Sequence, residues 1–188
     1  MSTTAAVRVA IDLMHVPSRV RYARAAPLPA DVAILLQIAA GDEAAEVAAA
    51  EAVDRPRDTI RQASAFFIEQ ILLGPDSDSY RVLGADRTAS TSELRRNMAL
   101  LLRWLHPDMH HDHSIFAGRV TAAWETLKTA DRRAAYDRER IMRPRQKRMR
   151  KDRSRAGSTI TKLWRVPRPS FLRRAILLLR GAFPGNTG

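Results

Sequence analysis

The sequence predicts an all-α protein. Apolar residues recur at helical spacing along most of residues 27–137. Serine and aspartate precede several of these stripes, and glycine or proline follows them, as expected at helix starts and ends. No alternation of apolar and polar residues persists, and no Asn-Gly or Asp-Gly turn is present. Strands are therefore not expected.

Residues 1–26 show little periodicity, and we expect them to form a poorly ordered lead-in. They contain no charged start followed by an apolar run and a cleavage site, so no secretory signal is predicted. No run reaches the roughly 18 apolar residues that span a bilayer. Since cysteine is absent, disulfides, thiolate zinc sites and thiol catalysis are excluded. We expect a cytoplasmic protein, with peripheral membrane association left open.

Residues 27–74 are predicted to form a small helical domain. The first stripe begins near Asp31 and stops at Gly41. The next segment is rich in alanine and glutamate, which favour helices. A third stripe ends at Gly74-Pro75 and comprises Ile60, Ala63, Phe67 and Ile71. This domain is either a stabilising extension or a specificity module that binds another protein.

A second helical group is predicted at residues 77–140. It opens with a short helix closed by Gly84. Ser90 and Glu93 then form a capping box, in which each side chain takes a free backbone amide. The stripe that follows comprises Leu94, Met98, Leu101 and Leu105. A further stripe, comprising Phe116, Val120, Ala123, Trp124 and Leu127, predicts an antiparallel partner helix after a loop of about 8–10 residues.

The loop between these two helices contains four of the chain's five histidines. A metal site there would use His106, His110, His111 and His113 with Asp108 and Asp112. The spacing matches no compact ligand motif, because Pro107 stands where an HExxH helix needs glutamate. No nucleophile lies nearby for acid–base chemistry. We therefore predict no metal or catalytic site, and expect the last three histidines to lie on the loop surface.

Three motifs run through the second helical group in order. YRVLG begins at residue 80, HPD follows the capped helix at residues 106–108, and AAYD ends the block at residues 134–137. HPD between two amphipathic helices, with the other two motifs at its flanks, is far more specific than the tripeptide alone. The block resembles the J-domain of DnaJ-like co-chaperones, in the reduced class without zinc or Gly/Phe regions.

The resemblance implies a co-chaperone that docks on a DnaK-class heat-shock chaperone and stimulates its ATP hydrolysis. It implies no cofactor, no enzyme activity of the chain itself and an unidentified client protein. The chaperone-binding residues that it implies are His106, Pro107, Asp108, Arg95, Arg96 and Arg103. Pro107 would rigidify the displayed turn, which lowers the entropy lost on docking. Asp108 could accept charge-assisted hydrogen bonds.

One part of the block departs from the family. Positions that are often basic hold Ala99, Leu100 and Trp104. Leu100 and Trp104 form an i, i+4 pair beside the predicted core stripe. We expect this pair to pack against the N-terminal helical domain or the tail helix. The departure leaves open an alternative function, a membrane- or nucleic-acid-binding adaptor whose J-fold has lost chaperone coupling.

The basic excess of the chain lies in its tail. Residues 138–188 hold 16 of the 32 basic and 2 of the 20 acidic residues, a net charge of +14, whereas residues 1–137 carry −2. We predict a basic linker at 141–169 and a basic amphipathic helix at 170–183. The tail helix could dock on the body, bind anionic lipid or bind nucleic acid. The candidate anion-binding residues are Arg143, Arg145, Lys147, Arg148, Arg150 and Lys151.

Overall fold

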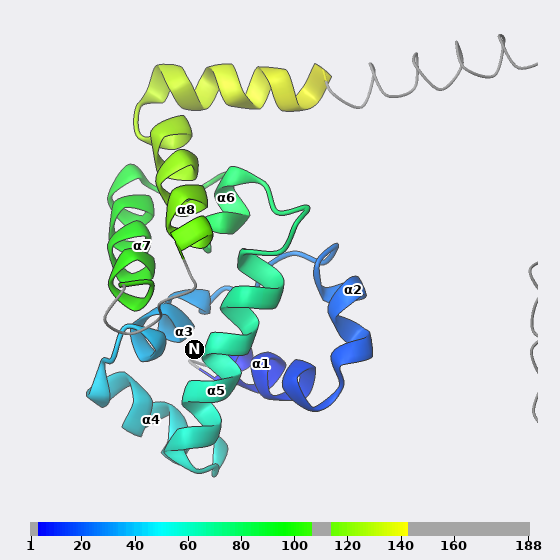
Figure 1. Cartoon of the computed structure of the whole chain (residues 1–188), viewed down its shortest axis with the longest axis vertical. Helices are drawn as coiled ribbons and strands as arrows, with labels where there is room; N and C mark the ends of the chain where they lie inside the picture. The colour runs from blue at the N-terminus through cyan, green and yellow to red at the C-terminus, as the bar shows by residue number, and fades with distance from the viewer. Residues whose placement is uncertain (1–3, 107–113, 143–188) are drawn as a thin grey trace, which may run out of the picture. The chain divides into compact units, whose positions relative to one another are not determined.

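The computed structural model describes residues 4–106 and 114–142, and all regular secondary structure in these ranges is helical (Figure 1). This confirms the predicted all-α class. The described residues up to 141 belong to one compact unit. The elements are α1 (Ala5–His15), η1 (Pro17–Arg19), α2 (Val20–Ala23), α3 (Val32–Ala39), α4 (Glu43–Val53), α5 (Arg57–Phe67), the π-helical η2 (Ile68–Leu72), α6 (Ser79–Val82), α7 (Thr91–Trp104) and α8 (Ser114–Leu127). Residues 130–142 are also helical.

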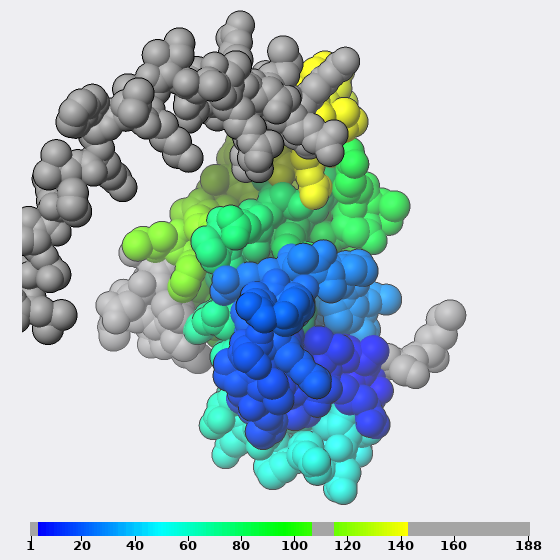
Figure 2. Space-filling model, turned by 90° about the vertical axis from the view of Figure 1, so that its right-hand side faces the viewer, coloured from blue at the N-terminus to red at the C-terminus, as the bar shows by residue number. Residues whose placement is uncertain are grey.

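The N-terminal residues are folded, so the prediction of a poorly ordered lead-in is wrong for residues 4–26. Helix α1 packs against α5 and α3, and one of its faces is buried in the core. Asp31 Oδ1 accepts the backbone N–H of Ala6 at 3.1 Å, near the start of this helix. The buried residues of α1 are Ala6, Val7, Ala10 and Leu13. Three of the four are small, which made the apolar stripe hard to recognise. In the space-filling view α1 and α2 (blue) form a continuous surface with their neighbours (Figure 2).

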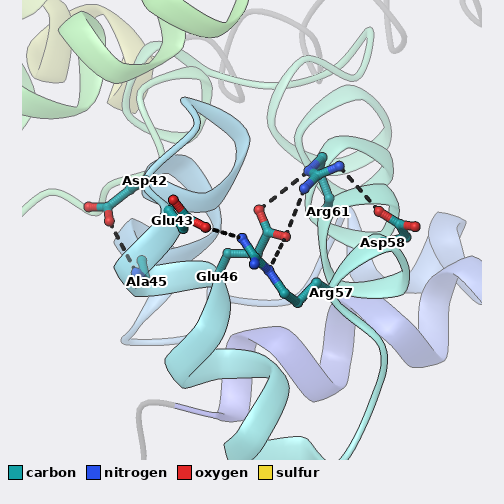
Figure 3. Close-up of polar contacts among 7 residues, drawn as sticks. All are labelled: Asp42, Glu43, Ala45, Glu46, Arg57, Asp58 and Arg61. Atoms are coloured by element: carbon teal, nitrogen blue, oxygen red, sulfur yellow. Dashed lines mark hydrogen bonds and ion pairs between the residues drawn. The ribbon is translucent and has the colours of Figure 1, made fainter.

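Helices α3, α4 and α5 lie where the apolar and alanine-rich segments predicted them. Gly41 has φ +82°, a left-handed conformation that ends the α3 segment and favours glycine. Asp42 then caps α4 by accepting the backbone N–H of Ala45 at 3.1 Å (Figure 3). Asp54 ends α4, also in the left-handed conformation.

A buried carboxylate ties α4 to α5 (Figure 3). The Glu46 side chain is only 4% exposed, and it pairs with Arg57 Nε at 3.0 Å and Arg61 Nη2 at 2.8 Å. Arg57 also reaches Glu43 at 3.0 Å. Hydrogen bonds to Glu43 and Glu46 raise the pKa of Arg57. Because a carboxylate is costly to bury without a partner, these two arginines are needed for the packing of α4 on α5.

The two predicted helical groups share one hydrophobic core. A single cluster of buried residues runs from Ala6 in α1 to Leu127 in α8. Helix α7 contacts both α8 and the N-terminal helix α3. The predicted division between residues 27–74 and 77–140 therefore separates segments of sequence, but it does not separate two cores.

Candidate functional site

Helices α7 and α8 lie side by side and form a hairpin, whose connecting loop contains the HPD motif (Figure 1). The end of α7 is well anchored. Leu105 is buried, and its N–H donates to the Leu101 carbonyl at 2.9 Å. His106 follows, with its N–H donating to the Arg103 carbonyl at 3.3 Å, and it is exposed. Pro107, Asp108 and the remaining loop histidines lie outside the described residues.

One face of α7 is basic and exposed. Arg95, Arg96 and Arg103 are all exposed, and the exposed Ala99 lies among them. On a helix of 3.6 residues per turn these positions share one side. The opposite side is buried and holds Leu94, Asn97, Leu101 and Trp104. The basic face therefore lies along the same helix that leads into His106.

Leu100 and Trp104 belong to the packed interior and not to this basic face. Trp104 is 5% exposed, and Leu100 is half-buried against the core. Because α3 contacts α7, the burial of the pair supports packing against the N-terminal helices. The alternative partner, the tail helix, lies outside the described residues. Burial explains why these two positions hold apolar residues where the family often has basic ones.

Asn97 joins the YRVLG turn to α7, a role that the sequence reasoning missed. Its Nδ2 donates to the carbonyls of Leu83 at 3.0 Å and Gly84 at 3.3 Å, and the side chain is fully buried. Gly84 has φ +61°, and a Cβ there would come within 3.2 Å of Leu36 in α3. In the sequence, the feature that could have indicated this role is that Asn97, a polar residue, stands three positions after Leu94 on the predicted apolar face.

The AAYD motif contacts the start of α6, at the other end of the second helical group. Tyr136 Oη accepts the backbone N–H of Ser79 at 3.0 Å, and Tyr80 Oη donates to Asp137 Oδ2 at 3.2 Å. The two tyrosine rings pack edge to face with centroids 5.9 Å apart. Burial and the neighbouring Asp137 raise the pKa of Tyr80. The first and last motifs thus form one contact that holds α6 against residues 130–142.

Neither metal ligands nor membrane spans are found in residues 4–106 and 114–142. Within these ranges no three histidine, aspartate or glutamate side chains are grouped so that they could hold a metal ion. Residues 107–113, which include His110, His111 and His113, lie outside these ranges. None of the described helices is both long enough and apolar enough to cross a membrane.

Known proteins match the second half of the described residues. The DnaJ domain family matches residues 78–137. Human DnaJ homolog subfamily C member 10 is 39% identical over 70 residues, which are 36% of this chain and 9% of that protein. Chaperone protein DnaJ of Cereibacter sphaeroides (strain KD131) is 41% identical over 64 residues, covering 32% of this chain and 17% of its own length. Chaperone protein DnaJ of Tropheryma whipplei (strain Twist) is 41% identical over 61 residues, covering 32% and 18%. No solved structure matches the chain.

The matched region spans less than a fifth of each of these relatives. It contains all three motifs, and in the structure their described residues lie on α6, on the α7–α8 hairpin and on the helix at residues 130–142. Residues 78–137 of this chain therefore carry a J-domain of the DnaJ type.

Proposed function

We propose that this protein is a J-domain co-chaperone that docks on a DnaK-class chaperone through His106, Pro107 and Asp108 and stimulates its ATP hydrolysis. The observation that carries the proposal is the exposed basic face of α7, which leads directly into the exposed His106. The relatives from Cereibacter sphaeroides and Tropheryma whipplei bear the name chaperone protein DnaJ. The protein itself is proposed to catalyse no reaction.

The basic face of α7 supports this proposal electrostatically. Within the described residues, Arg95, Arg96 and Arg103 form no ion pair, so their charges are available to a partner. A row of like charges steers an acidic partner surface and fixes its register. The N-terminal helices pack on the buried side of α7, so they do not cover this face.

A single-turnover ATPase assay with a DnaK-class chaperone tests the proposal. The wild type is expected to accelerate hydrolysis, and His106→Gln is expected to lose that acceleration. His15→Gln is the matched control, because His15 is exposed on α1 and distant in sequence from the hairpin. Equal stimulation by wild type and His106→Gln, or no stimulation by either, would contradict the proposal.

The second candidate function is the adaptor that binds an anionic membrane surface or nucleic acid. Its support is the net charge of +14 over residues 138–188, including the candidate residues from Arg143 to Lys151. Residues from 143 on lie outside the described residues, so this candidate rests on the sequence. Liposome flotation at low and high salt, beside a nucleic-acid shift assay, distinguishes the two ligands. Binding in neither assay would leave the tail helix as a segment that docks on the body.

A further inference from the structure

Three arginines converge on the C-terminal end of η2, and we call them the arginine clasp: Arg24, Arg81 and Arg119. Arg24 follows α2 in the N-terminal helices, whereas Arg81 lies on α6 and Arg119 on α8, within the J-domain. All three side chains are half-buried. The clasp therefore joins the J-domain to the helices that precede it.

Each member of the clasp donates to backbone carbonyls near this helix end. Arg24 Nε donates to the Gln70 carbonyl at 2.8 Å. Arg119 donates to the carbonyls of Leu73 and Gly74, the second at 2.7 Å. Arg81 donates to Ile71 at 3.3 Å, and it also reaches the carbonyls of Ala23 at 2.7 Å and Ala26 at 3.0 Å.

The physical reason for the clasp is the chemistry of a helix end. The last carbonyls of a helix have no partner within it, and they carry the negative end of the helix dipole. A planar guanidinium can serve two carbonyls at once, which an ammonium cannot do with fixed geometry. The charge of Arg81 is held partly out of water, and this burial lowers the pKa of Arg81. Removing Arg119 would leave the buried Leu73 carbonyl without this donor, whereas the carbonyls of Ile71 and Gly74 also accept hydrogen bonds from Ser77.

We infer that Arg81 and Arg119 are positioning residues for chaperone docking, because they fix the α7–α8 hairpin to the N-terminal helices. The inference rests on the proposed function. Arg119 holds α8 directly, and α8 packs along α7, which carries the basic face. Arg81 holds α6, and Asn97 of α7 binds the turn that follows α6. A rigid hairpin loses less freedom on docking, so the clasp favours a tighter complex.

Gly74 offers a way to disturb the clasp without removing a charge. A Cβ at this position would lie 2.9 Å from the Gln70 carbonyl oxygen and 3.1 Å from Arg24 Nε. Gly74→Ala should therefore shift the backbone at this position, whose carbonyl accepts a hydrogen bond from Arg119, and displace Arg24 from the Gln70 carbonyl. Gly118 on α8 is the matched control, because a Cβ there would meet no atom within 4 Å.

The test titrates the full-length protein against a DnaK-class chaperone in single-turnover ATP hydrolysis. Arg119→Ala and Gly74→Ala are expected to raise the half-maximal concentration about fivefold while the maximal rate stays unchanged, because only preorganisation is lost. Arg132→Ala and Gly118→Ala should match the wild type. Among the described residues, the Arg132 side chain pairs with Glu125 on the surface. Arg119→Lys should recover part of the loss.

Hydrogen exchange supplies a readout independent of the chaperone. Both clasp variants should speed exchange in α8 and leave α4 unchanged. Faster exchange in α8 with an unchanged half-maximal concentration would overturn the inference, since the clasp would then be structural only. A lower maximal rate with an unchanged half-maximal concentration would overturn it as well.

Failure of the wild type to stimulate hydrolysis would instead overturn the proposed function, and the positioning role with it. If Arg119→Ala does not fold, Gly74→Ala and Arg119→Lys decide the outcome.

Discussion

At the scale of single residues, Asn97 and Gly84 connect three parts of the molecule. Gly84 brings the turn after α6 against Leu36 of α3, and Asn97 of α7 binds the carbonyl groups of the same turn. The Asn97 amide nitrogen makes both of these hydrogen bonds within the core, whereas its Oδ1 has no hydrogen-bond partner among the described residues. Asn97 therefore fixes the position of the turn as well as filling space.

Replacement of Asn97 by alanine is expected to destabilise the protein. The change leaves buried carbonyls without a side-chain donor, which typically costs about 1–3 kcal/mol. Urea denaturation measures the loss. Arg95→Ala, on the exposed face of the same helix, should change stability by no more than about 0.5 kcal/mol. Equal stability of the two variants would show that the Asn97 hydrogen bonds contribute little.

Because Tyr80 is buried, we expect the free energy of unfolding to depend on pH in the alkaline range. Burial raises the pKa of this tyrosine above its usual value of 10.0. A group whose pKa is raised by folding stabilises the native state below the unfolded pKa, and the contribution is lost as pH rises through the folded pKa. Tyr80→Phe should therefore be less stable than wild type at pH 7, by about 1 kcal/mol for the hydrogen bond to Asp137.

This difference should shrink as pH rises above about 10, because the wild type then loses stability that Tyr80→Phe does not have. Denaturation of both proteins at neutral pH and at several values above 10 measures the trend. Tyr22→Phe serves as the control, since Tyr22 is 63% exposed. A constant difference between Tyr80→Phe and wild type at all pH values would argue against this role of burial.

At the scale of elements, the hairpin was well predicted and α1 was not. Ser90 caps α7 as expected, accepting the backbone N–H of Glu93 at 3.1 Å. Leucines at helical spacing give a strong stripe, so the buried face of α7 followed from the sequence. The alanines and valine of α1 give a weak stripe, because small residues are common on both buried and exposed faces. The contact of α3 with α7 depends on tertiary packing, which no local pattern encodes.

Trp104→Ala should loosen the contact between α7 and the N-terminal helices. Removing a buried tryptophan side chain typically costs about 3–5 kcal/mol. Hydrogen exchange over residues 27–74 should become faster. Ile115→Ala is the matched control, because Ile115 on α8 is 74% exposed. Unchanged exchange over residues 27–74 in Trp104→Ala would contradict this packing.

The basic face of α7 should set the salt dependence of chaperone docking. Replacing Arg95, Arg96 and Arg103 together by glutamine is expected to slow association and flatten its dependence on ionic strength, because electrostatic steering is lost. Binding kinetics at several salt concentrations measure both effects. The control removes three exposed arginines of the N-terminal helices, Arg8, Arg19 and Arg21. An equal effect of the two triple variants would assign the steering to net charge and not to α7.

At the scale of the whole molecule, the J-domain shares its core with the N-terminal helices. The all-α class, the α7–α8 hairpin and its motifs could be predicted from the sequence because they depend on local patterns. The single core and the arginine clasp could not, because they depend on which helices meet, whereas the packing of Trp104 followed from its apolar i, i+4 pairing with Leu100. His106 is placed at the end of α7, whereas Pro107, Asp108 and the tail remain predictions from the sequence.

The rate of single-turnover ATP hydrolysis by a DnaK-class chaperone, measured with increasing amounts of this protein, tests the central claim most directly. Chaperone docking through the HPD motif predicts a saturable acceleration by wild type and by His15→Gln, and none by His106→Gln. An unaccelerated rate with wild type, or the same acceleration with His106→Gln, would contradict it.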